Sequence, residues 1–338
     1  MSSHRDMETQ YRAVRENAGI FNRSKRGKVR AEGADCLRFL HGMVTNTVES
    51  LAENEGNYAA VTSARGQTLL DVWVHRLQEC IYMETEPGLA TKLIETLDRY
   101  LIADDVALSD ESDAWAIFGV QGPAAYELVG RVVGRVPADL PEHHTVVREF
   151  DGTSIWITAR SYTGEPGFDL RIAQNRTDSL RRALVTAGGT PIGWQVEEIL
   201  RVEAGIPRYG AEIDESVVPL EAGLNHAVDF DKGCYIGQEV IAKMHFRGRP
   251  RRYLTGLLLN KGTSAHALSG NTPVCGNITV NDKTVGRVTT CVKSLRLNRA
   301  ITLAIIRRGY HEAGQRVILD DGSEAEVVNL PFTANRLT

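Results

Sequence analysis

The sequence predicts an α+β protein, with a body of mixed helices and strands followed by a small all-β domain. Up to about residue 250, strands and helices mix without a strict βαβ period, and after it only short strands follow. The chain has no glycine-rich phosphate loop, GxSxG elbow or GxGxxG motif, which argues against a nucleotide-binding doubly wound sheet. Its 338 residues, 42% of them hydrophobic, suffice for two or three domains with proper cores.

Hydrophobic periodicity locates the elements of the body. Leucines recur every four residues over 88–102, which predicts an amphipathic helix. Two strands, 58–62 and 68–77, are joined by a glycine-containing hairpin loop. The other predicted strands are 27–33, 114–120 and 154–159, and the other predicted helices are 34–40, one starting at Gly122-Pro123, 177–187, 196–204 and 238–244.

After Pro250 the pattern changes to short strands separated by turn signals, which is typical of a small β-barrel or sandwich. The predicted strands are 254–259, 272–275, 278–280, 284–292, 301–306, 315–319 and 325–329. A domain boundary is therefore expected near residue 250.

The strand over 68–77 carries one carboxyl group in an apolar setting. Leu70, Val72 and Val74 share one face, and Asp71 lies on the other, which is also largely apolar. Such a strand is expected to be buried. Asp71 then either faces a pocket with a partner or forms a salt bridge at a sheet edge, and the pattern leaves both open.

The eight residues 232–239, Lys-Gly-Cys-Tyr-Ile-Gly-Gln-Glu, are the least ordinary stretch of the chain. Cys234 lies just ahead of a predicted helix start at Gln238, whose end carries a partial positive charge, and Lys232 adds a full charge. Both lower a thiol pKa, so Cys234 is a candidate reactive thiolate. A tight glycine turn around a buried small cysteine is the alternative.

Residues 231–239 resemble the signature of the YgfZ family, folate-binding proteins that assist the maturation of certain iron–sulfur enzymes. These proteins are relatives of the glycine-cleavage aminomethyltransferase, or T-protein, whose fold they share. Three further segments are similar to motifs of this superfamily, namely 162–168, 201–210 and 329–332. The matches cover nearly the whole chain in family order.

The resemblance implies a GcvT-like folate-binding body over 1–250, made of two interleaved ferredoxin-like subdomains divided near 112. A C-terminal β-barrel over 251–338 completes this expected fold.

The resemblance also implies that tetrahydrofolate is the cofactor. Glu165 would accept the adjacent N–H groups of the pterin, although the glycine-rich segment around it equally suits a plain turn. Tyr58 and Tyr209 would stack or hydrogen-bond around the ring, unless they are core tyrosines. Arg201 would anchor the ligand, with a helix-surface ion pair as its alternative, and Gln238 completes the candidate cofactor-binding residues.

Three functions follow from these residues. The main hypothesis is a tetrahydrofolate-binding protein that assists iron–sulfur cluster assembly or repair in client proteins, with Cys234, Lys232 and Asp71 as candidate catalytic residues. The alternative is an aminomethyltransferase with Asp71 as the acid at a folate nitrogen. In those enzymes this position belongs to an Asp-Asp pair, whereas here Leu70 replaces one member, which argues against transfer. The third is a folate-responsive binding module without turnover.

Composition limits the partners. A net charge of -4 implies no global attraction to nucleic acid or to an anionic membrane. The polar N-terminus, the lack of a long apolar run and five scattered cysteines predict a cytoplasmic protein with reduced thiols and no metal site. Four arginines, Arg247, Arg249, Arg251 and Arg252, suit a polyglutamate tail or an acidic partner, with a solvated linker as the alternative and RNA as a weaker one.

Overall fold

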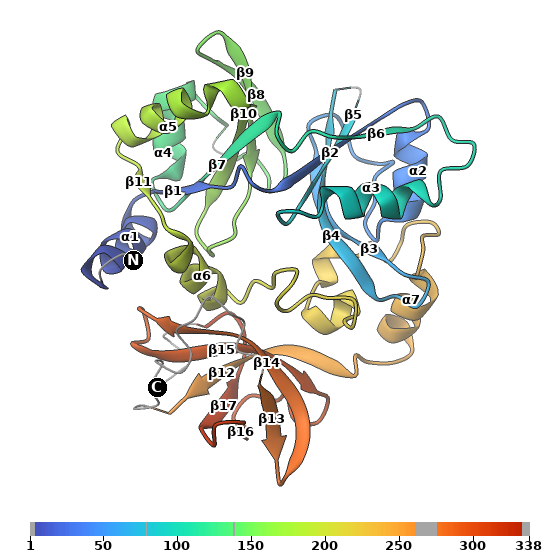
Figure 1. Ribbon diagram of the computed structural model, residues 1–338, viewed down its shortest axis with the longest axis vertical. Coiled ribbons are helices and arrows are strands. Elements are labelled where there is room, and N and C mark those ends of the chain that lie inside the picture. Colours follow the sequence, from blue (N-terminus) through green and yellow to red (C-terminus); the bar gives the residue numbers. More distant parts are fainter. Residues whose placement is uncertain (1–3, 79, 138, 261–275, 333–338) are drawn as a thin grey trace.

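The computed structural model describes residues 4–78, 80–137, 139–260 and 276–332. Two sheets lie side by side and a closed barrel of six strands lies below them in Figure 1. This arrangement confirms the predicted α+β class with a C-terminal barrel. No helix within the described ranges has the length and apolar character that crossing a membrane requires.

The first sheet has six strands in the order β11-β1-β7-β10-β9-β8. Its helices α4 (Ala125–Val133) and α5 (Thr177–Thr186) pack their apolar faces on it through Leu128, Val129, Leu180 and Leu184. The strands are β1 (Gly19–Asn22), β7 (Trp115–Gln121), β8 (Thr145–Phe150), β9 (Thr153–Ala159), β10 (Gly167–Ala173) and β11 (Thr190–Pro191).

The second sheet has five strands in the order β3-β4-β5-β2-β6. Helices α2 (Cys36–Met43) and α3 (Ala90–Asp98) close its core, in which Leu93 and Leu97 of the predicted leucine stripe are fully buried. The strands are β2 (Gly27–Glu32), β3 (Gly56–Thr62), β4 (Thr68–Leu77), β5 (Cys80–Thr85) and β6 (Ala107–Asp110).

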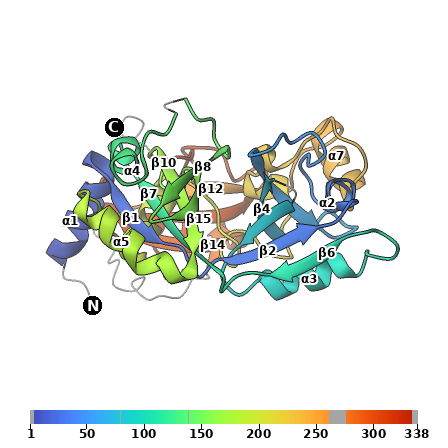
Figure 2. The same cartoon turned by 90° about the horizontal axis from the view of Figure 1, so that it is seen from above.

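The two sheets are interleaved in the chain. Strand β1 belongs to the six-stranded sheet, β2 to β6 form the other sheet, and β7 returns to the first. The view from above in Figure 2 separates the two halves, with β2 and the segment before β7 crossing between them. The predicted domain bounds, with a division near residue 112 and a boundary near residue 250, remain predictions.

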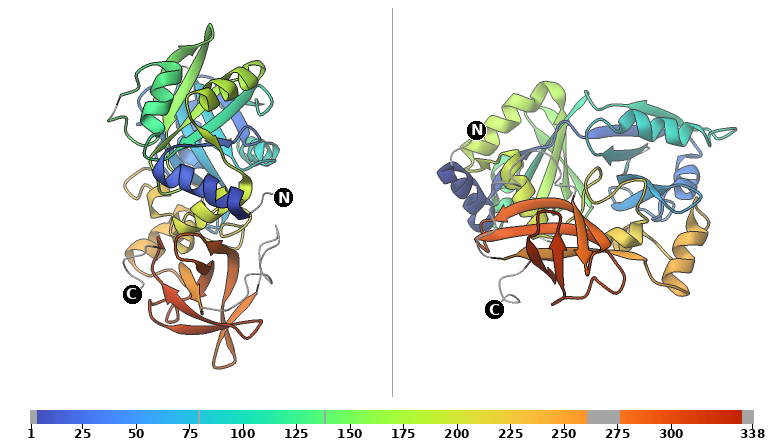
Figure 3. Two further views of the ribbon diagram at one scale, coloured as in Figure 1. Left: turned by 90° about the vertical axis from the view of Figure 1, so that its left-hand side faces the viewer. Right: turned by 60° about the horizontal axis from the view of Figure 1, so that its bottom comes forward.

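Helix α6 (Trp194–Glu203) packs the body against the barrel, and α1 (His4–Glu16) packs on α6. Helix α6 lies between the six-stranded sheet and the barrel, as both panels of Figure 3 show, and contacts β14 and β15. The barrel strands are β12 (Arg252–Leu259), β13 (Asn277–Val280), β14 (Lys283–Ser294), β15 (Arg299–Arg307), β16 (Arg316–Leu319) and β17 (Glu324–Val328). The strand predicted over 272–275 lies outside the described residues.

Six described strands of the body were not predicted, namely β1, β5, β6, β8, β10 and β11. Strand β10 shows the reason, because its sequence GFDLRIA places Asp169 and Arg171 among apolar residues. Both side chains are buried, and Asp169 accepts a hydrogen bond from Arg160. Because these buried charged residues interrupt the run of apolar residues, the hydrophobic pattern did not identify the strand.

Candidate functional site

A cavity of about 210 Å³ opens where the two sheets meet α6. Strand β4, the segment between β1 and β2, the residues after β5 and β9, and the loop after α6 all contribute to its wall. The lining residues are Asn22, Arg23, Lys25, Arg26, Asp71, Trp73, Glu86, Pro87, Ser161, Tyr162, Trp194, Glu197, Glu198, Arg201, Ile206, Pro207 and Arg208.

Asp71 is the carboxyl group on the β4 side of this cavity. Leu70, Val72 and Val74 point into the sheet core, so the alternation along β4 turns Asp71 to the opposite face, where it lines the cavity. Tyr58 donates a 2.6 Å hydrogen bond to Asp71 Oδ2, whereas the buried Oδ1 has no hydrogen-bond partner within the described part of the chain. Burial, with Glu86 nearby, raises the pKa of Asp71 from its ordinary 3.8 to about 6. The pocket-facing alternative for Asp71 is therefore confirmed.

Five buried polar atoms of the lining residues have no hydrogen-bond partner among the residues that the structure describes. They are Asp71 Oδ1, Trp73 Nε1, Tyr162 Oη, Arg23 Nε and Arg26 Nε. Leaving one such group unsatisfied costs about 1–3 kcal/mol, so a cluster of them indicates a polar occupant. A pterin ring fits this set, because it is flat and carries both donors and acceptors along its edge.

Ion pairs and aromatic rings hold the rest of the wall. Arg26 pairs with Glu86 at 2.6 Å and Arg23 pairs with Glu197 at 2.7 Å. The Arg23 guanidinium also lies 3.9 Å from the centre of the Tyr162 ring. Because these arginines are already paired, the wall offers rigid, nearly neutral polar surface.

The cavity mouth is more open than its floor. Trp194 is 49% exposed and has the Arg208 guanidinium 4.4 Å from its ring centre. Lys25, another lining residue, is exposed. An aromatic and anionic tail would find complementary groups here, outside the volume that holds the ring.

Arg201 lines the cavity, but other protein groups occupy its guanidinium. It donates to Glu212 at 2.8 Å and to the carbonyl oxygen of Ile206 at 2.6 Å, and it pairs with Glu198. The side chain also reaches Thr290 of the barrel. The helix-surface alternative is wrong, because Arg201 is buried and ties α6 to the barrel.

Glu165 is not among the residues that line the cavity. Its carboxylate accepts a 2.7 Å hydrogen bond from Arg15, which also pairs with the buried Glu203. The positive φ of Gly164 shows that the segment forms a turn, as the alternative for this motif proposed. Direct contact between Glu165 and a pterin therefore remains a prediction that this geometry does not favour.

Glu165→Ala is expected to lower the free energy of unfolding by about 1–2 kcal/mol, because Arg15 loses a charge-assisted partner. Tetrahydrofolate affinity should change less than threefold, since the side chain is off the cavity wall. Urea unfolding and calorimetric titration measure the two effects. The matched control is Glu16→Ala, whose ion pair with Arg12 is exposed. A large loss of affinity with unchanged stability would restore the pterin-binding role.

Tyr58 is a buried tyrosine that does not line the cavity and reaches it only through its hydrogen bond to Asp71. Besides Glu165 and Tyr58, four predicted site residues lie away from this wall. The Tyr209 hydroxyl donates to the carbonyl oxygen of Leu69 and accepts from Lys92. Gln238 is the first residue of α7 (Gln238–Phe246), as predicted, and Cys234 is exposed. The fourth is Lys232.

The environment of Lys232 differs from the one expected. Its ammonium donates to three carbonyl oxygens, those of His41, Val44 and Asn46, at and beyond the C-terminal end of α2. Burial lowers the pKa of Lys232 to about 8. Lysine at this position thus has a structural role, and its assignment to catalysis, like that of Cys234, stays a prediction.

Several cavity residues were not singled out from the sequence. Tyr162 belongs to a quoted motif, and Arg23 and Arg26 form a basic run with Lys25 and Lys28 that could have signalled the site. Nothing local distinguishes Glu86, Trp194, Glu197, Glu198 and Arg208, which only the fold brings together.

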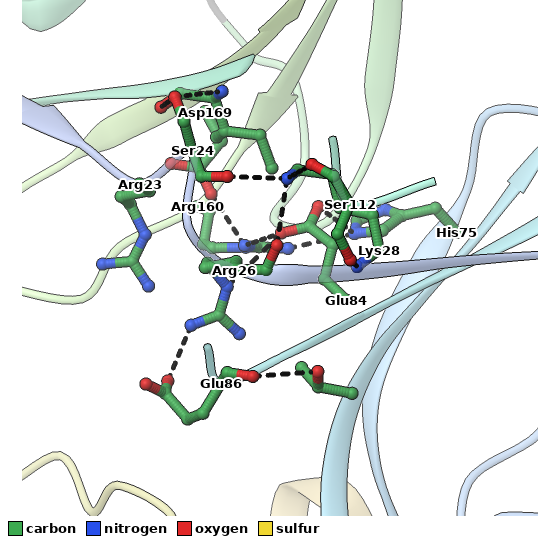
Figure 4. A network of polar contacts seen from close by, with 12 residues as sticks. Arg23, Ser24, Arg26, Lys28, His75, Glu84, Glu86, Ser112, Arg160 and Asp169 are labelled. Atoms are coloured by element: carbon green, nitrogen blue, oxygen red, sulfur yellow. Dashed lines mark hydrogen bonds and ion pairs between the residues drawn. The ribbon is translucent and has the colours of Figure 1, made fainter. Parts of the chain in front are cut away.

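A buried ionic network supports the cavity from behind (Figure 4). Arg160 donates to Asp169 of β10 at 2.7 Å and to Glu84 of β5 at 3.2 Å. Its second nitrogen lies 3.0 Å from His75 Nε2 on β4, and its guanidinium lies 4.7 Å from the Trp73 ring centre. Burial and the neighbouring Arg160 lower the pKa of His75 well below its ordinary value, so the imidazole is neutral. One arginine thereby joins the two sheets.

Comparison with known proteins gives matches over almost the whole chain. Residues 2–232 match the GCVT N-terminal domain and residues 252–333 match the glycine cleavage T-protein C-terminal barrel domain. An aminomethyltransferase of Rubrobacter xylanophilus is 31% identical over 96% of this chain and 86% of its own length. One of Exiguobacterium sibiricum is 31% identical over 90% and 82%. The crystal structure of an aminomethyltransferase of Bartonella henselae aligns with a TM-score of 0.85 at 20% identity, covering 98% of this chain and 91% of its own, which shows a shared fold.

Proposed function

The chain belongs to the glycine cleavage T-protein family, and from this membership we propose that it is an aminomethyltransferase. Enzymes of this family use tetrahydrofolate as the acceptor of a one-carbon unit. In the proposed reaction the aminomethyl carbon leaves the sulfur of a lipoyl carrier and becomes bonded to the folate nitrogens, and ammonia and the dihydrolipoyl thiol are released.

The observation that carries this proposal is the state of Asp71. A buried carboxyl with one oxygen held by Tyr58 and the other free in a cavity is oriented to meet a nitrogen of a bound ligand. A pKa of about 6 suits a group that gives or takes a proton near neutral pH. Tyr58 orients this carboxyl by its hydrogen bond.

Tetrahydrofolate fits the remaining lining residues. We propose that the pterin lies against Trp73 and Tyr162, where unpaired polar atoms meet its edge. The aminobenzoyl ring and glutamate tail would lie at the mouth, against Trp194, Arg208 and Lys25. Tetrahydrofolate supplies the nucleophilic nitrogens, and the cavity wall excludes water around them.

The iron–sulfur function expected from the sequence is wrong, because relatives that cover 90–96% of the chain are aminomethyltransferases. The narrower placement in the YgfZ family is replaced for the same reason. The absence of a second Asp beside Asp71 also no longer argues against aminomethyl transfer. Leu70 is fully buried in the sheet core, so a carboxylate at that position would not face the cavity.

The purified protein is expected to release ammonia and form methylenetetrahydrofolate in equal amounts from an aminomethylated lipoyl donor. Turnover should fall in the common range of about 1–1,000 s⁻¹ and require tetrahydrofolate. Product absorbance and an ammonia assay measure both products. Tight binding of tetrahydrofolate with no product would contradict the proposal and favour a folate-responsive binding module. The cytoplasmic location expected from the sequence remains a prediction.

A further inference from the structure

A basic patch covers the end of α7, the linker to the barrel and the end of β15. It is defined by Lys243, His245, Arg247, Arg249, Arg251, Arg307 and Arg308, all exposed. The barrel holds its two halves together, since the backbone N–H of Arg308 donates to the carbonyl oxygen of Arg251 and Arg307 pairs with Arg252 in the ladder. Residues distant in the sequence therefore form one surface.

Neither of the two chain segments that form this patch contains an acidic residue. Segments 240–253 and 299–311 contain neither Asp nor Glu, although the chain as a whole has a net charge of -4. Arg252, which follows the patch residue Arg251, pairs with Glu221 at 2.7 Å, so its charge is neutralised. Among the described residues, none of the seven patch side chains forms an ion pair. The positive charge is thus left available to something outside the chain.

An aromatic side chain stands within the patch. Phe246 is 65% exposed at the end of α7, where it packs edge-on against Phe230 and His245. Its position is thereby fixed although most of its surface faces solvent. A fixed exposed ring among arginines has the composition of the energetic centre of a protein interface.

We infer that the basic patch docks the acidic face of the carrier protein that presents the aminomethyl group, an inference that rests on the proposed function. Charge complementarity selects the partner and accelerates the encounter, and Phe246 supplies an apolar contact within the charged surface. Single-stranded nucleic acid fits less well, because it needs several rings for successive bases. The nearby Tyr253 is already stacked on His311 at 4.0 Å.

The test compares a double variant of the patch with a double control variant, each assayed with two donors. Arg247→Glu with Arg249→Glu reverses two patch charges, and Arg181→Glu with Arg182→Glu reverses two exposed charges on α5 as the matched control. Each protein is assayed with the aminomethylated lipoyl carrier protein and with free aminomethyl-dihydrolipoamide, which has no protein surface.

The patch variant is expected to raise the KM for the carrier at least about tenfold at low ionic strength and to flatten its salt dependence. Its kcat, its KM for tetrahydrofolate and its activity with the free donor should match the wild type and the control. Phe246→Ser should raise the carrier KM while keeping the salt dependence.

Three results overturn the inference. An unchanged carrier KM in the patch variant, or an equal rise in the control, would show that the patch does not dock the carrier. Tight binding of a 20-nucleotide single strand that the patch variant loses, with the carrier KM unchanged, would assign the surface to nucleic acid. Absence of transfer from both donors in the wild type would overturn the proposed function and this inference with it. Activity of the wild type with the free donor shows that the proposed function holds, so a failure of the docking inference alone can be recognised.

Discussion

Asp71→Asn is expected to lower kcat for aminomethyl transfer by about 10²–10⁴-fold, the usual contribution of a positioned proton-transfer group. The amide keeps the size of the side chain and still accepts the hydrogen bond from Tyr58, but it carries no titratable proton. The KM for tetrahydrofolate should change much less than kcat. Steady-state assays with both substrates varied separate the two effects.

The matched control is Asp98→Asn, because Asp98 is exposed at the end of α3 and its side chain is remote from the cavity lining. A variant at Asp71 that retains full kcat would remove the proton-transfer role and leave Asp71 as a structural partner of Tyr58.

The titration of Asp71 also gives a pH signature in stability. Its folded pKa of about 6 lies above the ordinary 3.8, so the native state binds more protons between these values. Wild-type stability relative to Asp71→Asn should therefore be highest below about pH 4 and fall, by up to about 3 kcal/mol, as pH rises through 6. Urea unfolding of both proteins from pH 4 to pH 8 measures this difference, and parallel curves would contradict the raised pKa.

Arg160→Ala is expected to lower the free energy of unfolding by about 3–5 kcal/mol. Arg160 is 2% exposed, and its removal leaves Glu84 and Asp169 buried without their shared cation. Burial opposes the ionisation of Glu84, but the charge of Arg160, with Arg26 nearby, brings the pKa of Glu84 below its ordinary value. Removing this arginine leaves Asp169 without its cation and leaves Glu84 with only the more distant Arg26, 3.6 Å away, so most of the cost of the buried charges is no longer offset.

Chemical denaturation measures this loss, with Arg176→Ala as the control. Arg176 pairs with Asp151 at a similar distance but in an exposed setting, so its loss should cost at most about 1 kcal/mol. Because Arg160 also lies over Trp73, tetrahydrofolate affinity should fall in the Arg160 variant that remains folded. Equal costs for the two variants would show that the network does not join the sheets.

The octapeptide around Cys234 illustrates where a sequence motif misleads. Lys232 closes the end of α2 through three carbonyl oxygens, and Gly237 has a φ of +86°. A Cβ on Gly237 would lie 2.4 Å from the carbonyl oxygen of Ser63. Packing against the β3–β4 hairpin explains much of the unusual composition, so the motif supports a function less strongly than its rarity indicated.

Periodicity by itself indicated the α+β class, an all-β unit of short strands after residue 250, and the two faces of β4, with Asp71 opposite Leu70, Val72 and Val74. Those features depend on near neighbours in the chain, whose spacing sets which face is buried. The tertiary structure alone decided that Asp71, Glu86, Tyr162 and Trp194 share one cavity, and that Glu165 belongs to Arg15. Contacts such as that between Arg160 and Glu84 join residues 76 positions apart, and a local pattern carries no information about such pairs.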